Sequence, residues 1–293
     1  MASLKDIKRQ IRAVKQTQKL TKAMNMVAAA KLRATQGRTE SFRAYADEHH
    51  RLMEAIGLQS QELDHQLLRH NENAGRVKIL AISSDRGLCG SFNTNLSHLL
   101  DKKILDWRKA GHKESLFLVG RKLKDYYGRR PVEVSHAMTG VLGNFDYHLA
   151  QEISETLTKE FLEGTVREVW ILTTKFLGMA RQEPALIPFL PLVHETEESL
   201  ARHHTGYGYL VEPDPATLFN RLIPRSLTIA VYQALLESVT SENAARMQAM
   251  DNASKNCKEI TESLTTVYNK LRQAAVTNEL LDIVNGSEAL AAA

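Results

Sequence analysis

The first seventy positions carry apolar residues at the three-and-four spacing of a single helix face. This stretch contains no proline, and its only glycines are Gly37 and Gly57. Ser3 and Asp6 have the spacing of a capping box at a helix start. We therefore predict one long N-terminal helix that would bend, if at all, near a glycine. Its predicted apolar face consists of Leu4, Ile7, Ile11 and Val14 and, after a shift in register, Thr17, Thr21, Met24 and Ala28.

A second heptad pattern runs along the last third of the chain. Asp214 followed by Pro215 is typical of a helix start, and Pro224 is a place for a break or kink. The stretch Ser226–Val284 would extend roughly 88 Å as a helix, longer than a compact domain of this size needs. The predicted seam consists of Ile229, Tyr232, Leu236 and Val239 and, after polar Asn243 and Arg246, of Met250, Ala253, Cys257, Ile260, Leu264, Val267, Leu271 and Ala274.

Between these two helices the pattern changes to short β-branched runs separated by helical stretches. Strands that alternate with helices indicate a mainly parallel sheet covered by helices. Ala185–Leu192 is apolar but rich in proline, which favours an edge strand or irregular chain. The expected strands are Val77–Ile82, Leu116–Val119, a weak Val132–Val134 and Val166–Thr174, and the expected helices are Asn93–Ala110 and Asn144–Leu162.

These patterns predict an α/β protein in which a long antiparallel coiled coil of the N- and C-terminal helices carries a central Rossmann-like α/β domain. The expected divisions are an N-terminal shaft helix at 1–74, an α/β foot domain at 75–193, a loop at 194–213 and a C-terminal shaft helix at 214–293.

The charge of the chain is unevenly distributed. The net charge is +4, yet residues 1–43 contain eleven Lys or Arg against only Asp6 and Glu40. So basic a stretch indicates an anionic neighbour, which would be nucleic acid, a membrane surface or an acidic protein. No aromatic residue that would stack on single-stranded bases precedes Phe42. A positive shaft inside an acidic protein sleeve and a basic coiled-coil nucleic-acid-binding protein remain as alternatives.

The turn Ser83–Asn93 (SSDRGLCGSFN) follows a predicted strand and precedes a predicted helix, where phosphate-binding turns lie. It contains neither GxxxxGK[ST] nor GxGxxG, so a structural or protein-contact turn is favoured and a nucleotide-binding enzyme is the third interpretation. Arg86 beside Cys89 would lower the pKa of the thiol if its guanidinium lay close. We instead expect Cys89 to be a partly buried structural cysteine.

No pattern in the sequence indicates catalysis. Cys89 and Cys257 have no CxxC or metal-ligand spacing, which is typical of free thiols in a reducing compartment. The histidines lack HExxH spacing and are expected to be solvated, and neither GxSxG nor SxxK occurs. We expect no catalytic residue, no cofactor and no bound metal. The absence of an eighteen-residue apolar run predicts no transmembrane helix, and no secretory signal or presequence is expected.

Four segments resemble the gamma subunits of F-type ATP synthases. Thr17–Leu32 (TQKLTKAMNMVAAAKL) resembles part of that family's N-terminal helix, and Arg86–Asn93 (RGLCGSFN) resembles its turn after the first strand. Ser241–Ser254 (SENAARMQAMDNAS) and Val267–Leu290 (VYNKLRQAAVTNELLDIVNGSEAL) resemble its C-terminal signature. The matches occur in order along the whole chain, although the middle is covered only loosely.

The resemblance implies a non-catalytic rotor. The terminal helices would form a shaft inside the hexamer of alpha and beta subunits, and the foot would rest on the epsilon subunit and the proton-driven membrane c-subunit ring. It implies no nucleic-acid partner and a peripheral position on the cytoplasmic face of a bacterial inner membrane. The inserted cysteine pair of chloroplast members is absent, so thiol control of that kind is not expected.

The family's contact residues can be carried over to matching positions. Contacts with the beta subunits would fall on two residues of the N-terminal helix and three of the C-terminal helix: Lys22, Met24, Arg272, Gln273 and Thr277. Contacts with the ring would fall on Tyr209 and Glu212, although Val211 stands where some relatives have a second tyrosine.

Overall fold

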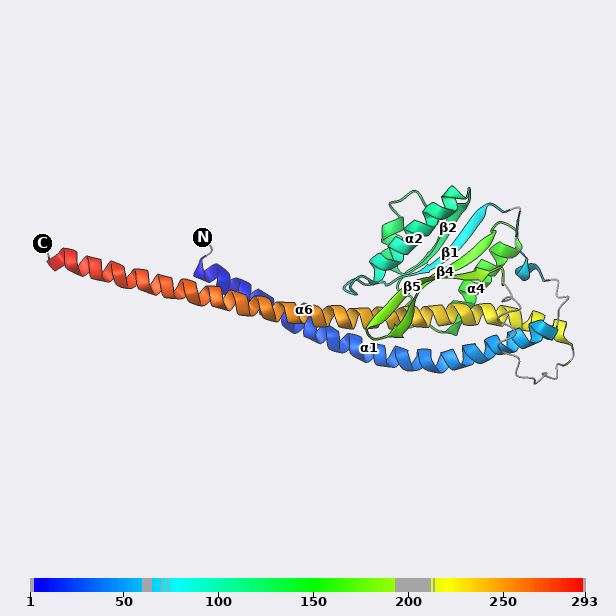
Figure 1. Ribbon diagram of the computed structural model, residues 1–293, viewed down its shortest axis with the longest axis horizontal. Helices are drawn as coiled ribbons and strands as arrows, with labels where there is room; N and C mark the ends of the chain where they lie inside the picture. The colour runs from blue at the N-terminus through cyan, green and yellow to red at the C-terminus, as the bar shows by residue number, and fades with distance from the viewer. Residues whose placement is uncertain are drawn as a thin grey trace. The chain divides into compact units, whose positions relative to one another are not determined.

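The computed structural model describes residues 3–59, 65–69, 71–72, 74–192, 212 and 214–291. Two compact units are present: one contains Met1–Ala28 and Met247–Ala293, and the other contains Ala29–Arg246. Helix α1 (Leu4–Gln59) and helix α6 (Pro215–Ala291) each contribute to both units. The predicted long terminal helices are therefore confirmed, and each unit is described separately below (Figure 1).

Local sequence accounts for where these helices start. The Ser3 hydroxyl accepts a hydrogen bond from the Asp6 amide, and the Ser3 amide donates to the Asp6 carboxylate, which confirms the capping box. Asp214 accepts from the Thr217 amide at 2.8 Å, as an N-cap does. Pro224 lies inside α6, which continues through it without the break that was considered.

In the unit Ala29–Arg246, α1 and α6 run antiparallel. The Thr39 and Thr240 hydroxyls are 2.9 Å apart in a buried hydrogen bond, and Arg43 pairs with Glu237 at 3.1 Å. Further along, the Arg225 guanidinium donates to the Tyr45 hydroxyl at 3.0 Å. Residue numbers rise along α1 while those of the α6 partners fall, so the predicted antiparallel pairing is confirmed.

The same unit contains a five-stranded sheet in the order β3-β2-β1-β4-β5. β1 pairs in parallel with β2 and β4, and β2 with β3, whereas β5 lies antiparallel at the edge beside β4. The mainly parallel sheet was predicted, and of the two alternatives for the proline-containing stretch the structure has the edge strand. The strands are β1 (Arg76–Ile82), β2 (Lys113–Val119), β3 (Glu133–Met138), β4 (Glu168–Gly178) and β5 (Arg181–Leu190).

Helices cover both faces of the sheet (Figure 1). On one face α2 (Phe92–Lys109) and α3 (Arg121–Tyr127) pack on the alternate side chains Val77, Ile79 and Ala81 of β1. On the other, α4 (Tyr147–Leu162) and α6 pack on Leu80 and Ile82. Helix α3 was not predicted, and η1 (Gln66–Leu68) is a 3-10 turn where a continuous helix was expected.

Helix α6 belongs to the core of the sheet layer. Its side chains Ile223, Leu227, Val231 and Leu235 are at most 1% exposed and share one apolar cluster with the strands and α4. Burying four such side chains stabilises the packing of α6 on the sheet by several kcal/mol, on the order of 1.5–3 each. The N-terminal part of α6 is therefore a structural element of the unit Ala29–Arg246, which we call the sheet domain.

In the unit Met1–Ala28 with Met247–Ala293, α1 and α6 turn one face each toward the other. Asn25 donates to the Met247 carbonyl at 2.8 Å, which fixes the register. The less exposed positions of this part of α1 include Leu4, Ile7, Ile11, Val14, Gln18, Thr21, Met24, Asn25 and Ala28. Of the positions predicted after Val14, Thr21, Met24 and Ala28 lie on this face, but Thr17 is exposed and Gln18 takes the inner position instead.

The predicted seam of α6 also needs a correction in this unit. Cys257, Leu264 and Leu271 lie on the less exposed face as expected, but Ile260 and Val267 are 48% and 43% exposed and Ala274 is exposed. The alternate inner positions are occupied by the next residue along the chain in each case: Thr261, Tyr268 and Ala275. The inner face is thus more polar than the apolar pattern indicated.

Candidate functional site

Parallel sheets of this strand order bind ligands where the order reverses, outside the carboxyl ends of the central strands. Here that point lies between β1 and β4, and α6 contacts both sides of it. Ser241 donates to the Thr174 carbonyl of β4 at 3.1 Å, and Arg246 donates to the carbonyls of Arg86 and Gly87 after β1. A helix of the same chain therefore packs where a nucleotide would bind in a dinucleotide-binding fold.

The turn Ser83–Asn93 uses its polar groups internally. The Ser84 hydroxyl donates to the Arg86 carbonyl at 2.7 Å, and the Asn93 side chain bonds to the Ser84 amide and hydroxyl. Asp85 accepts from the backbone amides of Arg121 and Gly140. These bonds hold the polar side chains of the turn within the protein, so the structure favours the predicted structural turn.

Two side chains join α6 to this turn. Arg246 pairs with Glu242 at 2.6 Å one helical turn away, and the two side chains are only 14% and 12% exposed. Burial raises the pKa of Glu242, while the charge of Arg246 opposes that shift. Arg246 thus holds three acceptors together, namely the Glu242 carboxylate and two carbonyls of the turn.

Replacing Arg246 is expected to loosen this junction. Arg246→Ala leaves the largely buried Glu242 carboxylate without its cation, which should lower the free energy of unfolding of the sheet domain by about 2–3 kcal/mol. Urea unfolding followed by tryptophan fluorescence measures it, because both tryptophans, Trp107 and Trp170, lie in that domain. Lys255→Ala is the control: it removes an exposed pair with Asp251 on the same helix and should leave the free energy of unfolding of the sheet domain essentially unchanged. If both variants lost the same free energy of unfolding, the contact of Arg246 with Glu242 and the turn would not stabilise the sheet domain.

Cys89 is buried, 2% exposed, as part of the α2 side of the core. Burial raises the pKa of its thiol, and the Arg86 group near its sulfur is the carbonyl, so the lowered pKa considered from sequence is wrong. We expect a thiol reagent to label Cys257 in the folded chain and to label Cys89 only after unfolding. Peptide mapping of the labelled chain measures this, and early labelling of Cys89 would contradict its burial.

The predicted contact residues form two separate groups on the helix pair. Because Asn25 contacts Met247, Lys22 and Met24 lie near residue 250 of α6 and far along it from Arg272. Lys22 is exposed and Met24 half-buried, whereas Arg272, Gln273 and Thr277 are all exposed. The Thr277 hydroxyl donates to the Gln273 carbonyl at 3.0 Å. Of the predicted foot contacts, Glu212 is exposed and Tyr209 lies outside the described residues.

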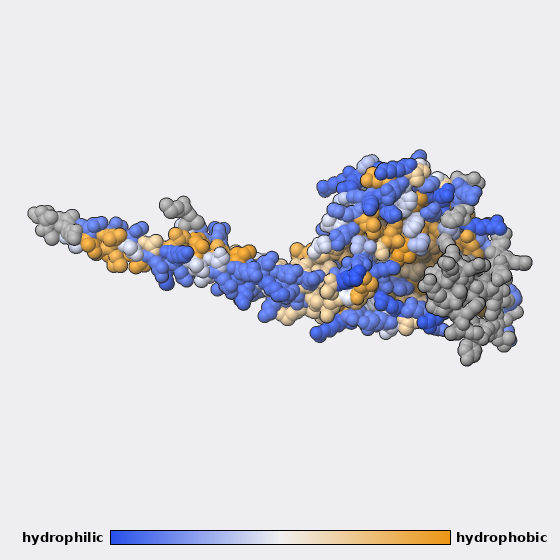
Figure 2. All heavy atoms as spheres, viewed as in Figure 1, coloured by the Kyte–Doolittle hydropathy of each residue, from blue (hydrophilic) through white to orange (hydrophobic). Residues whose placement is uncertain are grey.

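Sequence reasoning missed an exposed apolar surface on these helices. Figure 2 shows hydrophobic residues at the surface of the C-terminal part of α6. On α1 the exposed apolar side chains are Leu20, Met26 and Val27, which are 59–61% exposed. On α6 they are Ile260, Val267, Val276, Leu280, Leu281, Ile283 and Val284, at 43–67%. Apolar surface of this extent is typical of a face that another protein covers.

Two buried polar side chains of the described residues have structural partners. Lys78 of β1 is 1% exposed, and its ammonium group donates to Glu160 at 2.6 Å and to Ser135. His49 is buried against Tyr45, and burial lowers its pKa, so the expectation that the histidines are solvated is wrong for this one. Within the described ranges, no three His, Cys, Asp or Glu side chains gather as metal ligands.

None of the described helices contains a stretch long and apolar enough to cross a membrane.

Comparisons with known proteins agree along the full length. The family model described as ATP synthase matches residues 3–290. The chain is 40% identical over 291 residues to the ATP synthase gamma chain of Syntrophobacter fumaroxidans, covering 99% of both chains. It is 41% identical over 294 residues to that of Moorella thermoacetica, covering 99% of this chain and 100% of the relative.

Solved structures show the same fold. A chain of the central stalk and c-ring structure of Tetrahymena thermophila mitochondrial ATP synthase matches with a TM-score of 0.60 and 26% identity, covering 80% of this chain and 99% of that one. A chain from the Euglena gracilis mitochondrial ATP synthase matches with a TM-score of 0.69, covering 98% and 94%. At 20% identity this second match bears on the fold alone.

Proposed function

The chain belongs to the ATP synthase gamma-chain family, and from this premise we propose how it works as a rotor of the central stalk. It is a non-catalytic subunit, so its contribution is mechanical. Its helix pair would act as a shaft that turns inside the catalytic subunits, and its sheet domain would be the foot that receives the torque.

The observation that carries this proposal is that α6 contributes to both compact units. Its first part lies in the core of the sheet domain through Ile223, Leu227 and Val231, and the same helix continues uninterrupted to Ala291. Torque applied to the sheet domain would therefore pass into the helix through a packed core and a continuous backbone. The Arg246 junction ties the sheet domain to α6 at a second place.

We assign the exposed surfaces of the helix pair to the alpha and beta subunits. The exposed apolar residues of α6 would contact apolar surfaces of the alpha and beta subunits. The basic residues of α1 would contact acidic groups of the same subunits. Lys22, Met24, Arg272, Gln273 and Thr277 remain the proposed contacts with the beta subunits. As the shaft turns, its asymmetric surface would favour a different conformation in each beta subunit in turn.

We assign the foot to the epsilon subunit and the membrane c-subunit ring, with Tyr209 and Glu212 as proposed ring contacts. The protein would then be peripheral, held at the cytoplasmic face of a bacterial inner membrane through the ring. A nucleic-acid-binding role has no support in the comparisons, which are to ATP synthase chains.

Isolation from native membranes tests this function. The chain, tagged at its N-terminus, is pulled down from detergent extracts, and the eluate is assayed for ATP hydrolysis. We expect alpha and beta subunits to co-purify with ATPase activity, and untagged membranes should yield neither. A tagged chain recovered alone, or with nucleic acid, would contradict the proposal.

A further inference from the structure

In the unit Ala29–Arg246, helix α1 has a weaker apolar hold on the sheet core than α6 does. Helix α6 places large apolar side chains in the core that are at most 1% exposed, whereas Phe42, Leu52 and Met53 of α1 are only partly buried against it. The buried side chains of this part of α1 are mostly small or polar: Leu32, Thr39, Ala46 and His49. Small side chains interlock little with a neighbouring helix, so the position of α1 depends on its polar and aromatic contacts.

Arg38 of α1 contacts two other elements of the same unit. Its guanidinium donates to the Tyr232 hydroxyl of α6 at 2.8 Å and to the Phe145 carbonyl, in the loop between β3 and α4, at 3.2 Å. The guanidinium also lies 5.4 Å from the centre of the Phe145 ring, within the range of a cation–π interaction. One side chain therefore joins α1, α6 and the loop that leads into α4.

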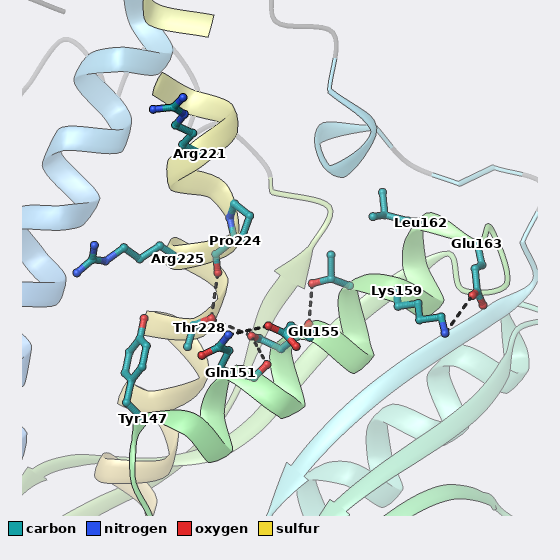
Figure 3. Close-up of a pocket in the computed structure, with 12 residues that line it drawn as sticks. Tyr147, Gln151, Glu155, Lys159, Leu162, Glu163, Arg221, Pro224, Arg225 and Thr228 are labelled. Carbon is teal, nitrogen blue, oxygen red and sulfur yellow. Dashed lines mark hydrogen bonds and ion pairs between the residues drawn. The ribbon is translucent and has the colours of Figure 1, made fainter. Parts of the chain in front are cut away.

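Tyr232, the first acceptor, is held by aromatic rings from three elements. Its ring centre lies 4.7 Å from that of Phe42 of α1, 5.6 Å from that of Tyr147 of α4 and 5.8 Å from that of Phe145. All three pairs are edge-to-face, an arrangement that favours a defined ring orientation. Figure 3 shows Tyr147 beside α6 at the start of α4. Because the ring is held from several sides, its hydroxyl is a fixed acceptor for Arg38.

Phe145, the second acceptor, belongs to backbone that is itself fixed. Its side chain is 6% exposed and lies in the same apolar cluster as the strands and α6. The next residue, Asp146, caps α4 by accepting from the Leu149 amide at 3.1 Å. Arg38 therefore bonds α1 to the sheet layer as well as to α6. Three further polar contacts join α1 to α6: Thr39 with Thr240, Arg43 with Glu237, and Tyr45 with Arg225, which extends toward α1 in Figure 3.

We propose that Arg38 is a positioning residue for the transfer of torque: it locks α1 to the sheet domain, so that the sheet domain turns both helices of the shaft together. The inference rests on the proposed function and deepens it, because such a lock matters only if the sheet domain drives the shaft. With Arg38 bound, α1 and α6 each have their own connection to the sheet layer and resist twisting in parallel. Without it, α1 is turned mainly through its contacts with α6.

The chemistry of the contact suits a lock. The guanidinium is permanently charged and both acceptors are neutral oxygen atoms, so the two bonds do not depend on pH near neutrality. Hydrogen bonds from a charged donor are stronger than those between neutral groups. Helix α1 is continuous from Leu4 to Gln59, so fixing it at Arg38 limits how far the whole helix can roll.

The torsional stiffness of the rotor in the purified synthase tests this lock. The catalytic subunits are fixed to a surface, and a particle is attached to Lys124→Cys of α3 in a chain whose Cys257 is replaced by serine. While the rotor pauses for scarce ATP, the variance of the particle's angle is inversely proportional to the stiffness between the catalytic subunits and the sheet domain. Arg38→Ala should raise this variance about twofold, because one of two helices that resist twisting in parallel loses its own connection.

Tyr232→Phe is the second variant, because it removes the hydroxyl acceptor and keeps the packed ring. It should raise the variance by less than Arg38→Ala does, since the bond to the Phe145 carbonyl remains. Adding it to Arg38→Ala should give no further rise, because both changes break the same bond. If Arg38→Ala does not assemble, Tyr232→Phe decides the test.

Arg51→Ala is the matched control, since Arg51 lies on the same helix and pairs with Glu48 of α1 itself. It should leave the variance unchanged. Subunit composition and ATP hydrolysis first establish that each complex is intact. An unchanged variance in either Arg38→Ala or Tyr232→Phe overturns the lock, as does an equal rise in Arg51→Ala. Particles that do not turn while the unaltered complex hydrolyses ATP contradict the proposed function instead, so the two failures are distinguishable.

Discussion

Removal of residues 274–293 is expected to leave a synthase that assembles and hydrolyses ATP but pumps protons poorly. The removed part of α6 contains Val276, Leu280, Leu281, Ile283 and Val284, which are 49–67% exposed. Because these side chains make little contact within the chain, its folding loses little when they are absent. What is lost is the proposed contact between the shaft and the catalytic subunits.

Inverted membrane vesicles measure this effect. The ratio of ATP-driven proton uptake to phosphate release should fall at least about fivefold. An effect of about fivefold is the lower end of the range that typical coupling free energies between two sites correspond to. A chain that ends at Ser287 keeps all five exposed apolar residues and should retain the normal ratio. If the shorter chain does not assemble, or if its ratio is unchanged, these residues do not have the assigned role.

Gly120→Ala is expected to have the largest effect on stability. Gly120 lies between β2 and α3 with a φ of +100°, and an added Cβ would lie 2.1 Å from the Ser83 carbonyl oxygen. That carbonyl belongs to backbone directly after β1, so it cannot move without disturbing the central strand. We expect the free energy of unfolding of the sheet domain to fall by about 3 kcal/mol or more.

Gly140→Ala separates the steric clash from the backbone conformation. Gly140 also has a positive φ, +79°, but an added Cβ there meets nothing within 4 Å. It should cost only about 1 kcal/mol, the price of a left-handed conformation. Urea unfolding followed by tryptophan fluorescence compares the two variants. Similar losses would show that the close approach of Gly120 to Ser83 does not constrain the fold.

The elements that follow from local chemistry were predicted well. The capping box at Ser3, the N-cap at Asp214 and the short apolar runs of β1 and β2 each depend on a few neighbouring residues. Helix α3 was missed because it is only seven residues long and has a short apolar pattern. A proline inside α6 did not break it, since the surrounding helix is held by packing on the sheet.

The seam of the helix pair was predicted only in part, for a physical reason. Ile260 and Val267 are apolar, yet they are exposed, and Thr261 and Tyr268 take the inner positions. A helix that contacts one partner carries one apolar stripe, whereas α6 carries apolar residues on two faces. From the sequence pattern alone, the apolar residues that face α1 cannot be separated from those that face outward. Two apolar faces are expected of a helix that contacts α1 on one side and surrounding subunits on the other.

The junction between α6 and the sheet could not be predicted from spacing. Arg246 and the turn at Arg86–Gly87 are 159 and 160 residues apart, and no local pattern links them. The same holds for Arg38 of α1, which lies 194 residues from its partner Tyr232 in the sequence. The contact residues carried over from the family remain predictions, because their partners lie in other chains.

Direct observation of rotation tests the central claim. Lys124→Cys places a reactive thiol at an exposed position of helix α3, in a chain whose Cys257 is replaced by serine and whose Cys89 is buried. A particle attached there to the purified, surface-fixed synthase is followed by light microscopy while ATP is added. The account predicts continuous rotation in one direction that stops when ATP is removed. A particle that only fluctuates at random while the same complexes hydrolyse ATP would contradict the rotor.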